Sequence, residues 1–466
     1  MMQKRQLVVN SIYYTTGEVF PRIISVLLLP VLTKYLTPAE YGINSYTNTV
    51  MMFSFVFCSL SLNTYLLRNY YKEDTPEGRK AITGNIFILM LMVNGSVTIL
   101  ELLTFPFLIA RLSIQVPFNP FFFLAIANNF LEGISIVPLV IYRVQEKARQ
   151  FATVNMTRTF LQFILTYVLI TRCHYGLLSV YMSRLFVNII YTILFLVILY
   201  RNSLFRPDKE LFRKALRFSL PLLPGALSYL FILSFDRIVL ERNLGLNELG
   251  LYSSAATLSL TLNIIIQGLY RSFEQKIFKE HNSPYYERVT DMLYKYFLVC
   301  LLTGGFLLSI FSREVFILFT SRKFLDAYKL VGWLVVPVII SGLTTFLGTL
   351  LIADHRQKLI TKATLISLLI TFAGNLTLIK ILGVYGAIWT MAASFFFVFF
   401  FYMRHVSLRN KYIPELLILL TILIAADLLL QGTSLSLAAA IALKMVFSAL
   451  YFGLCLFLLR VRLSRI

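Results

Sequence analysis

Charged side chains that interrupt long apolar stretches are the residues of this 466-residue chain best suited to chemistry. Glu18 and Arg22 stand four residues apart in the apolar stretch from Val8 to Leu32, which places them on one face of a helix. Later apolar stretches carry Glu132, Arg158, Arg184, Asp236 and Arg237. A charge at the centre of a bilayer costs at least about 2.5–3.5 kcal/mol, so these side chains are expected to face one another or a water-filled cavity.

The balance of the charges in the first half predicts what such a cavity binds. Arg22, Arg158 and Arg184 against Glu18 and Glu132 leave one surplus positive charge. A guanidinium group offers paired N–H donors that match phosphate oxygens, which predicts a substrate that carries phosphate. The alternative, a fully paired polar core without ligand contact, stays open. The two glutamates are the expected partners of the arginines and the sites at which a coupled ion would act.

Two further sets of charges lie in the second half of the chain. Asp236 and Arg237 are expected to contribute to the same substrate cavity. Asp427 and Lys444 stand in the last two apolar stretches, and we expect them to pair and so join the two helices.

The elements that carry these charges are predicted to be transmembrane helices. The mean hydropathy is +0.76, and 58% of residues are hydrophobic while 14% are charged, which excludes an ordinary soluble protein. About fourteen stretches are long and apolar enough to cross a bilayer. We therefore expect an all-α polytopic membrane protein.

An internal repeat organises these helices. The stretch from Leu32 to Ser45 recurs from Leu240 to Ser253 at a constant offset of 208 residues, with Leu, a basic residue, Leu, Glu, Gly and Ser at the same places. Such repeats are common in transporters. We predict an N-terminal lobe of six helices (1–200), a basic linker (201–217), a C-terminal lobe of six helices (218–404) and two additional helices (405–466).

The distribution of lysine and arginine predicts the orientation in the membrane. With the N-terminus inside, the inside segments hold 27 basic residues and the outside segments hold 8. Cytoplasmic loops carry the excess of basic residues, so both termini are predicted to be cytoplasmic. The linker is expected to lie along the cytoplasmic surface, partly as an amphipathic helix attracted to anionic lipids.

Motifs of covalent chemistry are not found in the sequence. It contains no G-x-x-x-x-G-K-[ST] loop and no H-E-x-x-H, and its four cysteines and four histidines are not spaced as metal ligands. We therefore expect neither an enzyme nor a bound metal or cofactor. The basic residues form no single soluble face, so nucleic acid is not expected as a partner.

Several short motifs, in order along the whole chain, resemble those of one family. They are 30–42 (PVLTKYLTPAEYG), 67–71 (LRNYY), 221–224 (PLLP) with 236–237 (DR), 248–252 (ELGLY), and Asn375 with 383–387 (GVYGA). The chain is similar to the polysaccharide-export flippases of the multidrug/oligosaccharidyl-lipid/polysaccharide (MOP) exporter superfamily, notably the O-antigen and capsule repeat-unit (Wzx-type) flippases.

The resemblance implies a fold and a function. The fold would be two six-helix lobes in a V around a central cavity, as in MATE transporters, with two C-terminal helices that could form a groove for a lipid tail. The function would be to flip undecaprenyl-diphosphate-linked oligosaccharide across the bacterial plasma (inner) membrane by alternating access. H⁺ or Na⁺ are candidate coupling ions, membrane lipids are expected partners, and so are polysaccharide polymerase and chain-length proteins. Arg22 falls where lipid II flippases also place a cavity arginine.

Two other functions stay open at this point. A cation-coupled multidrug antiporter on the same fold would carry cationic cargo and should show a surplus of buried acids rather than arginines. A membrane-embedded glycan polymerase or ligase should carry a large external loop with catalytic residues, which the sequence does not contain.

Overall fold

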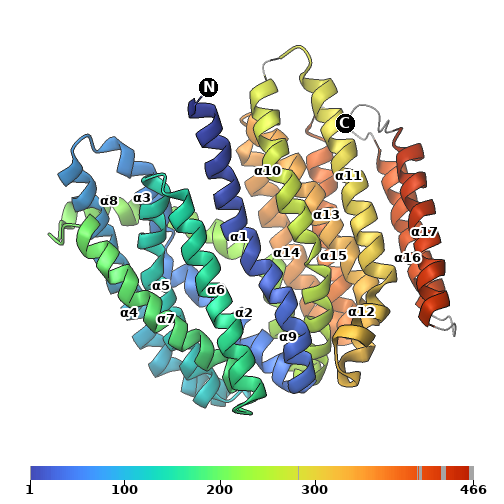
Figure 1. The fold of residues 1–466 in the computed structure, drawn as a ribbon, viewed down its shortest axis with the longest axis horizontal. Helices are drawn as coiled ribbons and strands as arrows, with labels where there is room; N and C mark the ends of the chain where they lie inside the picture. The colour runs from blue at the N-terminus through green and yellow to red at the C-terminus, as the bar shows by residue number, and fades with distance from the viewer. Residues whose placement is uncertain (1, 282, 407, 409–411, 432–436, 461–466) are drawn as a thin grey trace. The chain divides into compact units, whose positions relative to one another are not determined.

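A computed structural model describes residues 2–281, 283–406, 408, 412–431 and 437–460 (Figure 1). All regular secondary structure in these residues is helical, which confirms the expected all-α fold class. The chain divides into two compact units. Unit 1 comprises Met1–Leu28 and Ala39–Leu230, and unit 2 comprises Leu29–Pro38 and Phe231–Ile466. The helices α1 (Met2–Tyr35) and α9 (Leu223–Ser259) therefore contribute residues to both units.

Unit 1 is built around one helix, α5. The other helices of the unit are α2 (Pro38–Ser59), α3 (Leu62–Asn69), α4 (Pro76–Leu112), α6 (Ala148–Thr171), α7 (Leu178–Asn202) and α8 (Lys209–Ser219). The helix α5 (Phe123–Val144) packs against α3, α4, α6 and α7. Apolar side chains such as Ile86 and Met90 of α4 and Val137 and Ile141 of α5 are buried together there. Side chains on the other faces of α5 are thereby held in fixed places.

Unit 2 is built around α13. Its helices after α9 are α10 (Leu262–Glu280), α11 (Tyr286–Ile310), α12 (Ser312–Phe319), α13 (Tyr328–Ala353), α14 (Gln357–Leu382), α15 (Val384–Met403), α16 (Ile413–Gln431) and α17 (Leu437–Leu458). The helix α13 carries no charged residue after Lys329, and it packs against α10, α11, α12, α15 and α16. A helix that is apolar on every face must be buried in this way.

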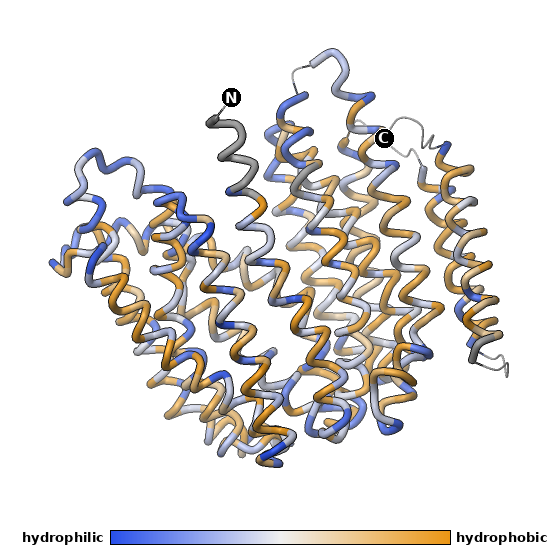
Figure 2. The backbone as a smooth tube through the Cα atoms, viewed as in Figure 1, coloured by the Kyte–Doolittle hydropathy of each residue, from blue (hydrophilic) through white to orange (hydrophobic). Residues whose placement is uncertain are grey.

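The described helices are long and apolar enough for a polytopic membrane protein. By length and composition eleven of them could cross a bilayer, or twelve if the bent pair α2–α3 forms one span. The expected number of spans was about fourteen, and two features account for the difference between fourteen and twelve. The helix α6 has 24 residues but also carries Arg149 and Arg158, and the run from Leu230 to Glu280 counts as one although it is interrupted at Gly245. Along most helices the apolar residues form the middle and the polar residues gather near the ends (Figure 2).

The repeat is visible in the backbone. The first half breaks between Tyr35 and Pro38, where α1 ends and α2 begins. The second half breaks at Gly245, which has a φ of 84° and interrupts α9. Gly245 lies 208 residues after Thr37, so the two breaks follow the offset of the sequence repeat. A positive φ is strained for residues with a side chain, which explains the glycine.

The basic stretch after α7 contains the short helix α8. Asp208 caps it, since its Oδ1 accepts hydrogen bonds from the backbone N–H groups of Glu210 and Leu211. Leu211, Phe212 and Leu216 pack against the core of unit 1, so the apolar face of this helix contacts protein. The exposed residues of the stretch include Arg206, Lys209, Arg213, Lys214 and Arg217. The predicted boundaries of the lobes and of the linker, and the attraction to lipid, stay predictions.

Gly250, which matches Gly42 in the internal repeat, allows a test of the packing within unit 2. A Cβ atom there would overlap the backbone carbonyl of Pro38, which belongs to the same unit. We expect Gly250→Ala to destabilise the protein by about 1–3 kcal/mol, because backbone cannot move aside as a flexible side chain can. Thermal unfolding of the purified protein in detergent measures this. Gly95→Ala is the matched control, since no atom lies within 4 Å of its added Cβ. Equal melting temperatures for both variants would contradict the packing.

The orientation can be tested with a native cysteine as internal control. Cys173 is exposed in a segment predicted to be outside, and Lys209 is exposed in the segment predicted to be inside. In a protein with Cys173 as its only native cysteine, a membrane-impermeant maleimide should label Cys173 in intact cells. A cysteine introduced by Lys209→Cys should react only after the cells are opened. Labelling of position 209 in intact cells would show that the orientation is the opposite of the predicted one.

Candidate functional site

A pocket of about 550 Å³ lies within unit 1. Its lining combines apolar side chains with amides and one ion pair. The lining residues are Asn44, Asn48, Met51, Met52, Phe55 and Val56 of α2, Ala125, Asn128, Asn129 and Glu132 of α5, Val180, Tyr181 and Arg184 of α7, and Ala226 and Leu230 of α9. We call it the unit 1 pocket. A mostly apolar pocket with a few convergent polar groups is the usual form of a ligand site.

Helical spacing explains why these side chains converge. Asn44, Asn48 and Met51 follow one another at intervals of four and three residues, and so do Asn128 and Glu132, and Tyr181 and Arg184. Residues three and four apart lie on the same face of a helix. Each of α2, α5 and α7 therefore turns one polar stripe toward the same space.

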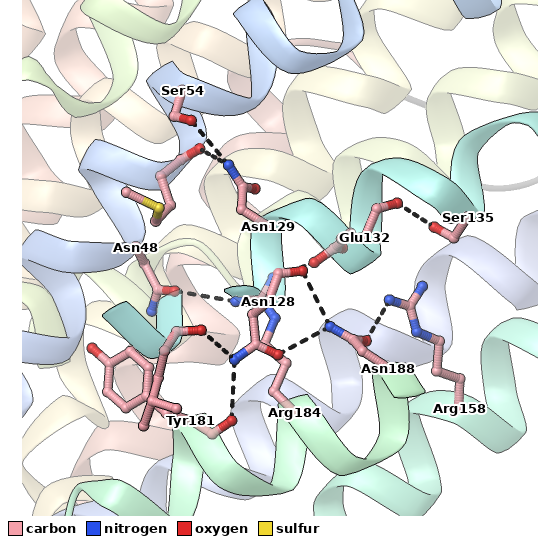
Figure 3. Close-up of polar contacts among 12 residues, drawn as sticks. Asn48, Ser54, Asn128, Asn129, Glu132, Ser135, Arg158, Tyr181, Arg184 and Asn188 are labelled. Atoms are coloured by element: carbon pink, nitrogen blue, oxygen red, sulfur yellow. Dashed lines mark hydrogen bonds and ion pairs between the residues drawn. The ribbon is translucent and has the colours of Figure 1, made fainter. Parts of the chain in front are cut away.

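Glu132 and Arg184 form the central ion pair of the pocket (Figure 3). Arg184 Nη2 donates to Glu132 Oε2 at 2.6 Å, and its Nη1 donates to Asn48 Oδ1 at 3.3 Å. Both charged side chains stay about one-third exposed, so they are held by protein and still reach the pocket. The arginine thus connects α7 to α5 and α2.

Arg158 begins a chain of hydrogen-bonded asparagines that ends on α7, one turn from Arg184 (Figure 3). Its Nη2 donates to Asn188 Oδ1 at 2.7 Å, and Asn188 Nδ2 donates to Asn128 Oδ1 at 3.1 Å. Asn128 in turn donates to the backbone carbonyl of Tyr181 at 3.1 Å. The Arg158 guanidinium thus lies in the same polar cluster as the Glu132–Arg184 pair, although no hydrogen bond joins it to that pair among the described residues. Two guanidinium groups against one carboxylate leave this cluster a net charge of one positive. The structure brings together Glu132, Arg158 and Arg184 as the sequence predicted them to be grouped.

A second group of hydrogen bonds lies on the other side of the lining. Asn129 Nδ2 donates to Ser54 Oγ at 3.0 Å, and Ser54 Oγ lies 3.8 Å from Cys58 Sγ. Ser54 and Asn129 are buried, and only Asn129 lines the pocket.

The spacing of Glu18 and Arg22 would allow these two side chains to form an ion pair with each other. The structure instead pairs Glu18 with Arg143 of α5, with 3.1 Å between Arg143 Nη2 and Glu18 Oε1. Arg143 also stacks over the Phe151 ring at 4.7 Å. The side chain of Arg22 is exposed, and it does not line the unit 1 pocket. Arg22 is thus left available for a ligand, whereas Glu18 already has a cation beside it.

Asp236 and Arg237 lie in unit 2 and form a local cluster. Arg237 Nη1 lies 3.1 Å from Asp236 Oδ1, the Tyr252 hydroxyl donates a short hydrogen bond to Asp236 Oδ2, and the guanidinium lies 5.9 Å from the centre of the Tyr252 ring. Neither residue lines the unit 1 pocket. Their contribution to a substrate site stays a prediction.

The prediction that Asp427 and Lys444 form an ion pair is wrong. Lys444 Nζ instead donates to both carboxylate oxygens of Glu314, each at 2.7 Å, and this pair is buried. Asp427 accepts from Gln431 Nε2 at 2.6 Å. Glu314 was not among the predicted membrane charges because it stands three residues after the end of a predicted span, 291–311, in the loop that follows.

The asparagines are the other residues that the sequence analysis missed. Asn44, Asn48, Asn128, Asn129 and Asn188 stand in apolar stretches, and all belong to the pocket lining or to its network. Their signal was available, because a polar amide in a membrane helix also needs a partner. Among the residues that the structure describes, no group of three or more His, Cys, Asp or Glu side chains could hold a metal ion.

This fold and site define a class of protein. Over 95% of its length the chain matches the lipid II flippase MurJ in an inward closed conformation, with a TM-score of 0.74 at 13% identity and 98% of that structure covered. It also matches an inward-facing multidrug-resistance MATE transporter of the MOP superfamily (TM-score 0.67, 15% identity, 85% of this chain and 99% of that one). A MOP superfamily transporter from Pyrococcus furiosus gives a TM-score of 0.58 at 16% identity, covering 88% and 97%. The fold is that of MOP transporters.

The sequence itself identifies the family. Residues 7–273, more than half of the chain, match the family model of polysaccharide biosynthesis proteins, so the chain belongs to that family. The Lsg locus protein 1 of Haemophilus influenzae is 24% identical over 269 residues, which is 56% of this chain and 64% of that protein. The match thus spans less than two thirds of that relative. The resemblance to polysaccharide-export members of the MOP superfamily is confirmed, and family and fold are those of transporters.

Proposed function

We propose that this protein flips undecaprenyl-diphosphate-linked oligosaccharide repeat units from the cytoplasmic to the outer leaflet of a bacterial plasma membrane. The flipped units would serve the synthesis of O-antigen, capsule or exopolysaccharide, and transport would proceed by alternating access. The single observation that carries the proposal is the network around Glu132, in which Arg158 and Arg184 leave one surplus positive charge beside a pocket in a polysaccharide biosynthesis protein. An excess cation there favours an anionic cargo.

The composition of the unit 1 pocket also fits a cargo of this kind. Its polar lining consists mainly of asparagines, whose amides both donate and accept hydrogen bonds and so suit the hydroxyl groups of a saccharide. Its methionine and phenylalanine side chains supply apolar surface of the kind that covers the faces of sugar rings. A diphosphate and a saccharide joined to one lipid would therefore both find matching groups in unit 1.

A cation-coupled multidrug antiporter is the alternative that the fold allows, since MATE transporters share it. Such a protein carries cationic cargo and would be favoured by unpaired acids in the pocket. The one acid that lines the unit 1 pocket, Glu132, is paired with Arg184. The charge of the pocket therefore favours the flippase.

Arg22 gives a test of the proposed function outside the unit 1 pocket, since its side chain is exposed and suited to a diphosphate. We expect Arg22→Ala to abolish surface polysaccharide in a deletion strain while the membrane content of the protein is unchanged. Arg22→Lys should restore only part of it, because one ammonium group cannot replace paired guanidinium donors.

The control for this experiment is Arg172→Ala. Arg172 is also exposed, but unlike Arg22 it lies outside the predicted membrane spans. The control variant should leave surface polysaccharide at the wild-type amount, measured by immunoblot of the polysaccharide against that of the protein. Normal polysaccharide in Arg22→Ala cells would remove Arg22 from the site, and loss of the protein would assign it a structural role.

A further inference from the structure

One buried acid of unit 1, Glu101, has no cation beside it among the residues that the structure describes. Glu101 is the single charged residue of α4 between Lys80 and Arg111. It is 6% exposed, and its Oε2 is buried with no hydrogen-bond partner among the described residues. Its neighbours Leu100, Leu102 and Leu103 are exposed, so Glu101 points from α4 into the protein rather than toward lipid. An ionised carboxylate without a cation beside it, and with one oxygen lacking a hydrogen bond, is unstable in such a place, and the protonated acid is not.

This sets Glu101 apart from the two acids that the sequence singled out for ion coupling. Glu18 pairs with Arg143, and Glu132 pairs with Arg184. Adding a proton to either would break an ion pair and leave an arginine without its partner. Adding a proton to Glu101 breaks no ion pair of the described structure. Of these three acids, Glu101 is the one best placed to gain and lose a proton.

Glu101 is linked to the unit 1 pocket through two side chains. Its carboxyl group lies beside the Ser54 hydroxyl of α2, and Ser54 Oγ accepts a hydrogen bond from Asn129 Nδ2 of α5, which lines the pocket. The titratable group that faces this carboxyl from α2 is the Cys58 thiol, 3.8 Å from Ser54 Oγ. From α5 and from η2 (Phe118–Phe122), the side chains that contact Ser54 of α2 and Phe105 of α4 are Asn129 and Phe122, which do not titrate. The Glu132–Arg184 pair lies one turn further along α5.

The hydrogen bonds of Ser54 depend on the proton of Glu101. A serine hydroxyl has one donor and two acceptor positions, and Asn129 already occupies one acceptor position. When Glu101 is ionised, the Ser54 hydroxyl must donate to it. When Glu101 is protonated, the carboxyl can donate to Ser54, and the serine hydroxyl is free to turn toward Cys58. The proton on Glu101 thus decides to which atom the Ser54 hydroxyl donates, and with it how strongly Ser54 Oγ accepts the hydrogen bond from Asn129.

We propose that Glu101 is a proton-binding site whose state is communicated to the unit 1 pocket through Ser54 and Asn129. The role of this site as the coupling site of transport rests on the proposed flippase function, but its proton binding does not. An anion in the pocket repels the ionised form of Glu101, so anionic cargo and the proton bind with positive coupling. By linkage each then raises the affinity for the other.

Infrared spectroscopy of the purified protein tests proton binding without any cargo. The difference spectrum between wild type and Glu101→Gln should show the carbonyl stretch of one protonated carboxyl at low pH. The band should disappear as the pH is raised, because the carboxyl group then loses its proton. Ser54→Ala should move the midpoint about one pH unit upward, because it removes the donor that stabilises the ionised form. Asn129→Leu should move it in the same direction by less.

The controls separate the site from the function. Asp427→Asn removes a buried acid of unit 2 and should leave this midpoint unchanged. Undecaprenyl diphosphate, used as an anionic probe, should raise the midpoint in wild type and raise it less in Asn129→Leu, which lacks the hydrogen bond from the pocket to Ser54. A missing band, or one that does not titrate, would overturn the proton site. A midpoint that ignores Ser54→Ala and the probe would overturn the link to the pocket. Lack of flipping by wild type would refute the flippase instead, with the infrared result unaffected.

Discussion

Lys444→Met should lower the free energy of unfolding by about 3–5 kcal/mol, the usual cost of removing one partner from a buried ion pair. The Lys444 ammonium donates to both oxygens of Glu314, and the two side chains are 3% and 6% exposed. Without it the Glu314 carboxylate would stay buried beside α17 with no opposite charge. Chemical unfolding in detergent, or the melting temperature, measures the loss.

A double variant separates the ion pair from the packing of the helix. Lys444→Met combined with Glu314→Gln removes both charges, and most of the lost stability should return because no buried charge is then unpaired. If the double variant were as unstable as Lys444→Met alone, the loss would come from the packing of α17 and not from the charge.

Arg184→Gln should reduce flipping at least about tenfold, which corresponds to roughly 1.4 kcal/mol of lost transition-state binding. The variant leaves Glu132 and Arg158 as the charges of the network, so the surplus positive charge is lost. Initial rates of flipping in vesicles, at equal amounts of inserted protein, measure the effect.

Glu132→Gln together with Arg184→Gln is the matched control for this charge argument. The double variant again has one surplus positive charge, carried by Arg158, so part of the flipping should return. If the double variant flipped no better than Arg184→Gln, the geometry of the Arg184 contacts, and not the net charge, would control transport.

The sequence predicted the features that depend on composition and on local spacing. Apolar length and hydropathy predicted a polytopic helical protein. The repeat at an offset of 208 residues was also read from the chain, and the structure adds that a backbone break lies at the matching positions Thr37 and Gly245. The grouping of Glu132, Arg158 and Arg184 followed from the cost of leaving charges in lipid, which must be met by neighbours. These constraints act along one helix or on any buried charge, so they can be read from the chain.

The errors concern partners that come from distant parts of the chain. Helical spacing put Glu18 and Arg22 on one face, but it could not show that Arg143, 125 residues away, reaches Glu18. In the same way Asp427 and Lys444 stand on neighbouring helices, while Lys444 pairs with Glu314 of α12. Which side chains form an ion pair depends on how the helices pack, and local sequence patterns do not contain this information. Glu101 carried a clear signal as a lone acid in an apolar stretch, but only the structure shows that it has no cation beside it.

Flipping by the purified protein tests the central proposal most directly. Cells that lack this protein should accumulate its cargo on the cytoplasmic leaflet, and this lipid-linked saccharide can be extracted and placed in vesicles with the protein. A membrane-impermeant glycosidase or lectin outside the vesicles then reports movement between leaflets. The account predicts that wild type exposes the saccharide to the outside, that Arg184→Gln does so at least about tenfold more slowly, and that a cationic dye is not transported. Transport of the dye without movement of the saccharide would contradict the account and favour the multidrug antiporter.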